Sequence, residues 1–430
     1  MTAKKPHVSR KTVIMGGIAG NIMEWYDFAV YGYFAPVIAP QFFPSDSPQA
    51  SLIAAFGAFA AGFLMRPVGG MVFGHIGDKI GRKAALTLSV AMMAVPSVLI
   101  GLLPGYETLG IMAGVLLVAM RIVQGLSVGG EYTTSIVFLV EHAHHKRRGF
   151  MGSFSGFGAV GGALLGSAVG ALVNSVLPPE AVAAWGWRAA FLFGLVVGAS
   201  ALLLRKNIPE LETANDPDED DAVSPVVLAL KTEWRAILRV TGVLMVYAVG
   251  YYLIFLYLTT FLIDIVKVPA SEAMDINTAS MVVMMLLIPV MAHLSDKWGR
   301  KPLLLFASLG TLLLSYPLIW LMHHPNEILI VLGQFSFAVF MAAFAGANPA
   351  AMVESFPANV RCSAMSVSFN LSFAIFGGTA PLVASYLIEK SHDDLSIAFY
   401  LMAAGGLSAL ALLGLKDRAH EKRLPQSSEA

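Results

Sequence analysis

The chain has 430 residues and is strongly apolar, with 57% hydrophobic residues, only 13% charged residues and a mean hydropathy of +0.70. A typical soluble domain carries about 25% charged residues, so this composition excludes a water-soluble globule. The 28 basic residues balance the 28 acidic ones, which gives no general attraction to nucleic acid, and the single cysteine, Cys362, excludes an intramolecular disulfide and a cysteine-based metal cluster.

Long apolar stretches recur along the whole chain, and each is long enough to cross about 30 Å of hydrocarbon. Only helices and closed barrels satisfy their backbone groups in lipid, and these stretches are too long and too uniformly apolar for barrel strands. We therefore predict an all-α membrane protein with twelve membrane-spanning helices. The predicted spans are residues 12–38, 51–73, 84–103, 109–139, 149–173, 188–205, 236–263, 276–293, 303–322, 327–353, 362–388 and 396–415.

The basic residues predict the orientation of these spans. With the N-terminus placed in the cytoplasm, the lysines and arginines fall in predicted cytoplasmic segments, except Arg66, Arg121, Arg188, Lys267 and Lys390. Cytoplasmic loops of membrane proteins carry an excess of Lys and Arg, so we predict that both termini lie in the cytoplasm.

Two charged loops repeat about half a chain apart. Residues 74–83 read GHIGDKIGRK, and residues 292–301 read AHLSDKWGRK. Each loop joins the second predicted span of its half to the third, which indicates a duplicated membrane protein.

A second repeat supports the duplication. Glu141 and Arg148 lie seven positions apart, as do Glu354 and Arg361, and each pair follows the fourth span of its half. We predict that these charges form a cytoplasmic gate that latches the halves together and then releases them; the alternative is a set of static salt bridges. The predicted gate residues are Asp78, Arg82, Lys83, Glu141, Arg148, Asp296, Arg300, Lys301, Glu354 and Arg361.

The repeated loops resemble those of the major facilitator superfamily. Four further stretches look like its metabolite:proton symporter branch, which includes proline/betaine, α-ketoglutarate, citrate and shikimate transporters. These stretches are GNIMEWYDF at 20–28, FLMRPVGG at 63–70, RIVQGLSVGGEY at 121–132 and WGWR at 185–188. One departure is Ala292, where the loop motif expects glycine.

The resemblance implies the major facilitator fold, with twelve transmembrane helices in two six-helix bundles around a central cavity. It also implies alternating access and uptake driven by a proton gradient, in a bacterial inner (plasma) membrane. We expect an N-terminal bundle over 1–205, a cytoplasmic linker over 206–235, a C-terminal bundle over 236–415 and a cytoplasmic tail over 416–430.

Five charged residues lie within predicted spans: Glu24, Asp27, Arg66, Arg121 and Glu131. A charge at the centre of a membrane helix costs about 2.5–3.5 kcal/mol on insertion scales, so each requires a partner or a water-filled cavity. No histidine lies deep in a span, so the candidates for proton coupling are the carboxylates Glu24, Asp27 and Glu131. Glu24 and Asp27 share one helix face, and one of them is expected to pair with Arg66 or Arg121.

The substrate candidates are arginines, amides and tyrosines. Arg121 lies near the middle of its span, and its planar fork suits a carboxylate; the alternative is structural pairing with an acid. For Arg66, substrate contact and structural pairing with an acid are expected equally. The further candidates are Asn21, Tyr26, Tyr31, Tyr251, Asn348 and Asn370, because aromatic faces can hold a quaternary ammonium; the alternative for each is helix packing.

These residues predict a secondary active transporter that imports a small carboxylate-bearing metabolite by proton symport. The two arginines slightly favour an organic acid such as α-ketoglutarate or citrate. The alternatives are a proline/glycine betaine symporter, and an exporter or antiporter of the same fold. The sequence contains no nucleophile–base pair, metal-ligand cluster or nucleotide loop, so we expect no enzyme activity, cofactor or metal. The expected partners are the substrate, protons and the lipid bilayer.

Overall fold

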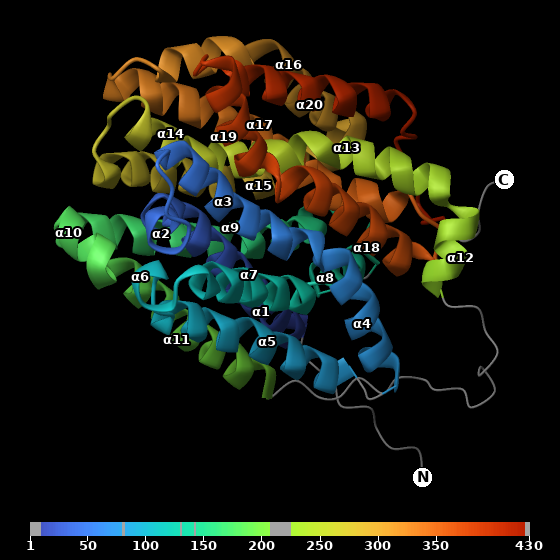
Figure 1. The fold of residues 1–430 in the computed structure, drawn as a ribbon. Helices are drawn as coiled ribbons and strands as arrows, with labels where there is room; N and C mark the ends of the chain where they lie inside the picture. The colour runs from blue at the N-terminus through green and yellow to red at the C-terminus, as the bar shows by residue number, and fades with distance from the viewer. Residues whose placement is uncertain (1–9, 80–81, 130, 142, 207–224, 426–430) are drawn as a thin grey trace.

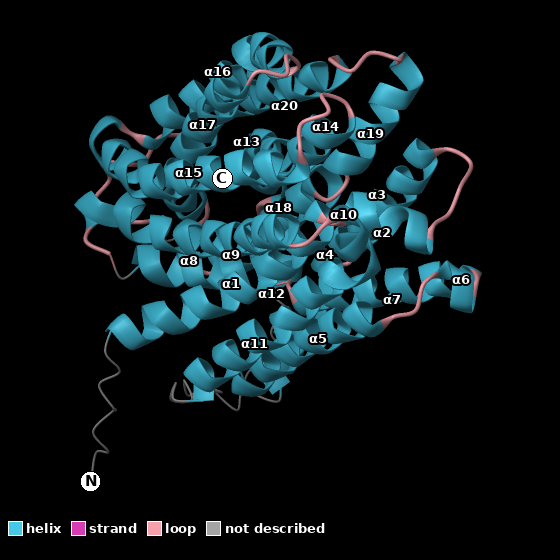
Figure 2. Cartoon of the chain, turned by 90° about the vertical axis from the view of Figure 1, so that its left-hand side faces the viewer, coloured by secondary structure: helices cyan, strands magenta, loops and turns pink. Residues whose placement is uncertain are grey.

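The computed structural model describes residues 10–79, 82–129, 131–141, 143–206 and 225–425, except for the side chains of residues 10–20, 74–79, 82–87, 131, 134, 138 and 201–206. Helices make up nearly all of this described part, which contains no β-strand (Figure 2). The prediction of an all-α protein is therefore confirmed.

The N-terminal half begins with a helix that carries five of the predicted substrate and proton residues, Asn21, Glu24, Tyr26, Asp27 and Tyr31. Its helices are α1 (Arg10–Tyr33), α2 (Ala35–Phe42), α3 (Pro48–Leu64), α4 (Arg66–Lys79), α5 (Arg82–Leu102), α6 (Tyr106–Leu109), α7 (Ile111–Ser127), α8 (Glu131–Glu141), α9 (Arg148–Val176), α10 (Pro179–Ala181) and α11 (Trp187–Lys206).

The C-terminal half repeats this plan with longer uninterrupted helices. They are α12 (Pro225–Thr232), α13 (Trp234–Tyr252), α14 (Leu258–Asp264), α15 (Ala270–Trp298), α16 (Arg300–Met322), α17 (Glu327–Glu354), α18 (Arg361–Ser372), α19 (Ala380–Ser391) and α20 (Ser396–Leu413). A π-helical turn, Leu253–Tyr257, joins α13 to α14, and another, Phe373–Gly377, joins α18 to α19.

Each predicted span falls on one helix or on two consecutive helices. Within the described residues, nine helical segments are long and apolar enough to cross a membrane; these nine, the shorter apolar helices Leu88–Leu102 and Ile111–Ser127, and α1 correspond to the twelve predicted spans. In the first two predicted spans, the break between helices coincides with a proline. Pro36 and Pro67 lie in the first turns of α2 and α4, where a missing backbone N–H costs little.

The two halves lie side by side as two bundles, with the blue-to-green helices below and the yellow-to-red helices above in Figure 1. Between them, α9 packs along α15 and α17, α3 packs against α19, and α8 packs against α18. The charged loops and α12 lie at one end of the bundles, and α2, α6, α10 and α14 lie at the other.

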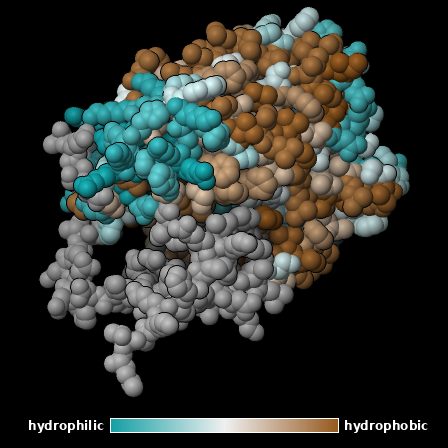
Figure 3. Space-filling model, turned by 180° about the vertical axis from the view of Figure 1, so that it is seen from behind, coloured by the Kyte–Doolittle hydropathy of each residue, from teal (hydrophilic) through white to brown (hydrophobic). Residues whose placement is uncertain are grey.

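A broad apolar belt crosses the face of the molecule seen in Figure 3. In the figure it is a brown band between hydrophilic ends. Large exposed hydrophobic side chains, such as Ile111, Leu313 and Leu413, lie on helices from both halves. A patch of this size on a protein surface marks contact with another apolar phase. With the spans, the belt identifies a multi-pass membrane protein.

Part of the predicted linker is helical. Residues 207–224, which include the acidic run, lie outside the described residues, but Pro225–Thr232 forms the short helix α12. Ala229 of α12 is fully buried, and the helix packs against α18. The end of the linker is thus part of the C-terminal bundle.

Candidate functional site

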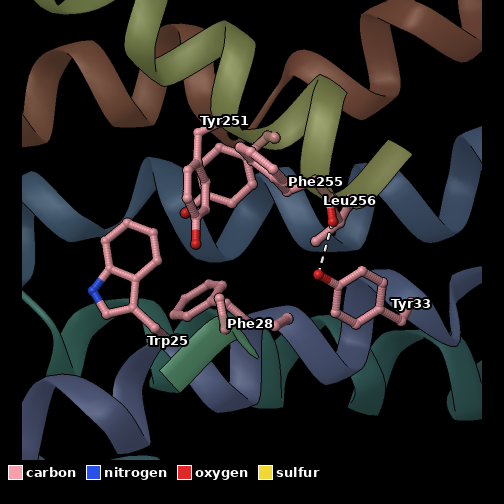
Figure 4. A pocket seen from close by; sticks show the side chains of 9 residues that line it. Trp25, Phe28, Tyr33, Tyr251, Phe255 and Leu256 are labelled. Carbon is pink, nitrogen blue, oxygen red and sulfur yellow. Dashed lines mark hydrogen bonds between the residues drawn. The ribbon is translucent and has the colours of Figure 1, made fainter. Parts of the chain in front are cut away.

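A small cavity lies between the two halves, with a volume of about 10 Å³, roughly the space of one water molecule. Figure 4 shows side chains of α1 meeting side chains of α13 and of the π-helical turn that follows it. The cavity is lined by Trp25, Phe28, Ala29, Tyr33, Ala163, Tyr251, Tyr252, Phe255 and Leu256. The lining side chains are buried, and this volume leaves no room for a molecule larger than water between the halves at this point.

The cavity wall is built around the indole of Trp25. The indole is nearly parallel to the ring of Tyr252, with centroids 6.3 Å apart and an interplanar angle of 10°. Tyr251 and Phe373 meet the same indole edge-on, at 5.4 and 6.1 Å. Aromatic faces attract cations, and cages of such faces recognise quaternary ammonium groups.

Buried polar atoms also surround the cavity. The hydroxyl groups of Tyr251 and Tyr252 and the indole nitrogen of Trp25 have no hydrogen-bond partner within the described part of the chain. Buried polar groups in proteins are nearly always paired. The wall therefore presents mainly aromatic and aliphatic surface to the cavity, and these unpaired donors lie on the side chains that form it.

An ion pair joins α1 to α4 beside this wall. Arg66 Nη2 lies 2.8 Å from Glu24 Oε1, and both side chains are buried. Arg66 Nε also donates to Asn370 Oδ1 of the C-terminal half at 3.5 Å, and Asn370 Nδ2 donates to the Gly129 carbonyl at 2.6 Å. The pair thus belongs to a contact between the two halves.

Asp27 and Arg121 do not pair directly. The Ser97 hydroxyl hydrogen-bonds to Asp27 Oδ2, and Gln124 Nε2 donates to Ser97 Oγ at 2.8 Å. Arg121 Nη1 donates to Gln124 Oε1 at 2.6 Å. A chain of two neutral side chains therefore separates the carboxylate from the guanidinium.

Aromatic rings hold the Arg121 guanidinium in place. Its central carbon lies 4.5 Å from the ring centroids of both Phe28 and Tyr31, and 5.6 Å from that of Phe59. These contacts are cation–π interactions. Because Phe28 also lines the cavity, Arg121 lies directly behind one of its walls.

At the charged end of the bundles, Arg300 ties together two helices of the C-terminal half. Its Nη2 and Nε donate to the two carboxylate oxygens of Glu354 at 3.0 and 3.2 Å, and its Nη1 donates to Asp296 at 2.7 Å. This bidentate geometry is the strong form of the interaction.

Two charged side chains of the C-terminal half, Asp296 and Arg361, also contact the N-terminal half. The Asp296 carboxylate accepts hydrogen bonds from the backbone N–H groups of Gly149 and Phe150, at 2.8 and 2.9 Å, where the dipole at the start of α9 favours an anion. Arg361 forms an ion pair with Glu141. The partner of Glu141 is thus the second-half arginine, not Arg148.

The tail covers this end of the molecule. Arg148 donates to the backbone carbonyls of Glu421 and Lys422, at 3.0 Å each, and Arg361 donates to that of Pro425 at 2.8 Å. Asp417 accepts from the backbone N–H of Lys301 at 2.9 Å. The tail therefore contacts both halves.

At the opposite end, neutral groups close the cavity. The Tyr33 hydroxyl donates to the Phe255 carbonyl at 2.7 Å, the dashed line in Figure 4. Asn277 donates to Tyr33 at 3.0 Å and to Ser167 at 3.0 Å, and Gln334 donates to Asn277 at 3.2 Å. The π-helical turn supplies the accepting carbonyl, because its ladder departs from the regular helix.

The comparisons with known proteins agree with this architecture. The family model for "Sugar (and other) transporter" matches residues 12–212, and that for "Major Facilitator Superfamily" matches residues 240–430. The glycine betaine/proline/ectoine/pipecolic acid transporter of Dickeya dadantii is 35% identical over 96% of this chain and 84% of its own length. The proline/betaine transporter of Escherichia coli K12 is 33% identical over the same shares.

The chain belongs to the major facilitator superfamily. Solved structures of this fold agree: the proton:xylose symporter XylE bound to 6-bromo-6-deoxy-D-glucose has a TM-score of 0.76, at 17% identity, over 96% of this chain and 97% of that one. An inward-open structure of the E. coli xylose transporter has a TM-score of 0.72 at 17% identity, over the same shares.

The predicted family and fold are confirmed, and this major facilitator is a transporter and not an enzyme. The preference for an organic acid is not supported. Two arginines suggested it, but one of them, Arg66, is already paired with Glu24, and the relatives are proline and betaine transporters.

The predicted substrate residues occupy different positions in this closed major facilitator. Tyr251 lines the cavity, and Asn370 contacts Arg66. Tyr26 instead donates to the Ala190 carbonyl at 2.6 Å, within the N-terminal bundle, and Tyr31 donates to the Ala55 carbonyl at 2.9 Å. Asn21 and Asn348 are buried, and neither the Asn21 side chain nor Asn348 Oδ1 has a partner in the described part of the chain.

Some predicted residues lie outside the described side chains. They are Glu131 of the proton-coupling set and Asp78, Arg82 and Lys83 of the gate. The remaining gate residue, Lys301, donates from Nζ to the Leu413 and Leu415 carbonyls, at 3.1 and 3.3 Å.

The sequence reasoning missed four neutral polar residues, Ser97, Gln124, Asn277 and Gln334. All four are buried and hydrogen-bonded near the cavity or the embedded charges. A signal for one was present, because Gln124 follows Arg121 by three positions and shares its helix face. Isolated amides in long apolar runs would have marked Asn277 and Gln334.

Proposed function

We propose that this protein imports proline or glycine betaine together with protons, by alternating access across a bacterial plasma membrane. The names of the relatives support the choice of substrate. Both compounds are zwitterions, so a binding site must offer a cation to the carboxylate and a separate environment to the ammonium.

The observation that carries the proposal is the aromatic cavity between the halves. Trp25 and Tyr252 face each other across 6.3 Å, with Tyr251 beside them. We assign the ammonium group of the substrate to these rings. In the closed conformation the cavity has room for about one water molecule, so the halves must move apart for substrate to enter.

The carboxylate of the substrate is assigned to Arg121. Two of its guanidinium nitrogens, Nε and Nη2, have no hydrogen-bond partner within the described residues, and Phe28 separates the guanidinium from the cavity. Arg66 is committed to Glu24 and Asn370. A movement of the Phe28 ring would bring the free side of Arg121 into contact with substrate.

The proton is assigned to Asp27. Its carboxyl group is fully buried and hydrogen-bonds to a neutral hydroxyl group, whereas Glu24 is held by a cation. A neighbouring cation favours the ionised carboxylate, and burial favours the neutral form. Asp27 is therefore the better candidate to gain and lose a proton during the cycle.

Purified protein in de-energised proteoliposomes tests the proposal. Adding external proline or glycine betaine should drive uptake and make the external medium more alkaline. Citrate and α-ketoglutarate, added in excess, should not compete. Uptake without proton movement would remove the coupling, and citrate flux without proline or betaine flux would overturn the substrate.

A further inference from the structure

We infer that Ser97 and Gln124 are positioning residues that link Asp27 to Arg121 during coupled transport. The inference rests on the proposed proton symport. Both side chains are fully buried, and neither lines the cavity. They act through the two ionisable groups that they connect.

Gln124 keeps the guanidinium away from the carboxylate. Arginine can only donate hydrogen bonds, so the amide oxygen of Gln124 must face Arg121, and its NH₂ group must face Ser97. This arrangement occupies one nitrogen of Arg121. A direct ion pair with Asp27 would instead commit the guanidinium and leave less of it for a substrate carboxylate.

Ser97 has two acceptors for one proton. Its Oγ is hydrogen-bonded to Asp27 Oδ2 and lies 2.8 Å from the Met93 carbonyl oxygen. When Asp27 is ionised, the Ser97 proton is donated to the carboxylate. When Asp27 is protonated, its own proton is donated to Ser97 Oγ, and the Ser97 proton turns to Met93.

In both arrangements, Ser97 Oγ accepts no more hydrogen bonds than it has acceptor sites. A hydroxyl oxygen has two acceptor sites; Gln124 occupies one in both states, and protonated Asp27 occupies the other. Ser97 thus stabilises either protonation state of Asp27 by rotating one O–H bond. No heavy atom needs to move when the proton arrives or leaves.

The hydrogen-bonded chain from Asp27 through Ser97 and Gln124 to Arg121, here called the relay, gives a route for coupling. Among the described groups around Asp27, Arg121 of α7 is the charged one. The other neighbours are neutral: Ser97 of α5, Gly194 of α11 beside Oδ1, and Tyr26 of α1. A substrate carboxylate bound to Arg121 compensates its charge. Ionised Asp27 then loses electrostatic support and takes up a proton, so that substrate and proton are carried together.

The test uses Ser97→Ala, Ser97→Thr and Ser336→Ala proteins in proteoliposomes. Alanine at 97 leaves ionised Asp27 without this hydrogen bond, so Asp27 stays protonated through the cycle. We expect proton-driven proline accumulation to fall by about tenfold or more, while exchange of labelled for unlabelled proline changes by less than about threefold. Threonine keeps the hydroxyl group and should retain accumulation.

Ser336→Ala is the matched control. Ser336 also donates to the carbonyl four residues earlier, at 2.7 Å, but it lies on an exposed helix face. This variant should behave like the wild type. Ser97→Ala protein that accumulates proline normally would overturn the inference, as would a parallel loss of exchange and accumulation in both the alanine and the threonine variants.

Gln124→Glu tests the other end of the relay. The isosteric carboxylate would pair directly with Arg121 and compensate its charge, so we expect the KM for proline to rise by about tenfold. Because Asp27 then lacks the support of Arg121 and stays protonated, the proton-to-proline ratio should fall. An unaltered KM would contradict the role of Gln124. Wild-type uptake without proton movement would refute the proposed symport itself, and that result is read separately from the variants.

Discussion

Near the cavity, the described part of the N-terminal half buries two acids and two arginines, whereas the C-terminal half presents tyrosine and phenylalanine rings. Asp27 and Arg121 lie behind the cavity wall, while Tyr251 and Tyr252 form the wall opposite Trp25. The two halves repeat one arrangement of helices, yet the side chains near the cavity are charged in one half and aromatic in the other.

The charged end shows what the halves still share. Both keep an acid and an arginine after their fourth span, and Glu141 of one half pairs with Arg361 of the other. In the proposed transport cycle, closure at this end uses contacts from both copies, whereas the proton is assigned to a carboxyl group of one copy. This assignment leaves the second half to shape the proposed substrate site.

The largest expected effect comes from removing the ionisable group at Asp27. In Asp27→Asn protein we expect proton-driven accumulation to be lost, by about a hundredfold or more, because the amide cannot release a proton. Exchange of labelled for unlabelled proline should persist. Accumulation assays at a fixed proton gradient measure the difference.

Glu24→Gln is the matched comparison for Asp27→Asn. It removes one partner of a buried ion pair and leaves Arg66 uncompensated, which is strongly destabilising. We therefore expect this variant to lose exchange and accumulation together and to melt at a lower temperature. If Glu24→Gln lost only accumulation, the proton would be assigned to the wrong acid.

A smaller effect is expected from the aromatic wall of the C-terminal half. Tyr252→Leu should raise the KM for glycine betaine by about tenfold, because a desolvated cation–π contact contributes about 2 kcal/mol. The KM for proline should rise less, since its ammonium can also hydrogen-bond. Tyr252→Phe keeps the ring and should stay near the wild type; equal losses in both variants would argue against ring recognition.

The fold was largely readable from the sequence because lipid imposes one solution on long apolar runs. Each of the predicted spans coincides with one helix or two consecutive helices. The π-helical turns at Leu253–Tyr257 and Phe373–Gly377 were not predicted, because an extra residue in a turn leaves the apolar pattern nearly unchanged. One of them supplies the carbonyl that holds Tyr33.

The site was predicted only in part. Embedded charges stand out in an apolar chain, so Glu24, Asp27, Arg66 and Arg121 were found. Their partners were not fixed, because pairing depends on how helices distant in sequence pack together. Ser97 carries no charge and resembles any small residue of a membrane helix, so its bond to Asp27 is visible only in three dimensions.

The smallest expected effect concerns the tail, which spans the two halves at their charged end. Deleting residues 417–430 removes the carbonyl acceptors of Arg148 and Arg361, and hydrogen bonds to charged groups contribute about 1.5–3 kcal/mol each. Part of this is recovered from water at the exposed end, so we expect the melting temperature in detergent to fall by only about 2–5 °C. Deleting residues 426–430 alone leaves the described contacts intact and should cause no change. An equal shift in both truncations would show that the contacts of residues 417–425 do not stabilise this end. The Glu141–Arg361 ion pair and the hydrogen bonds from Gly149 and Phe150 to Asp296 would then be the principal connections between the halves there.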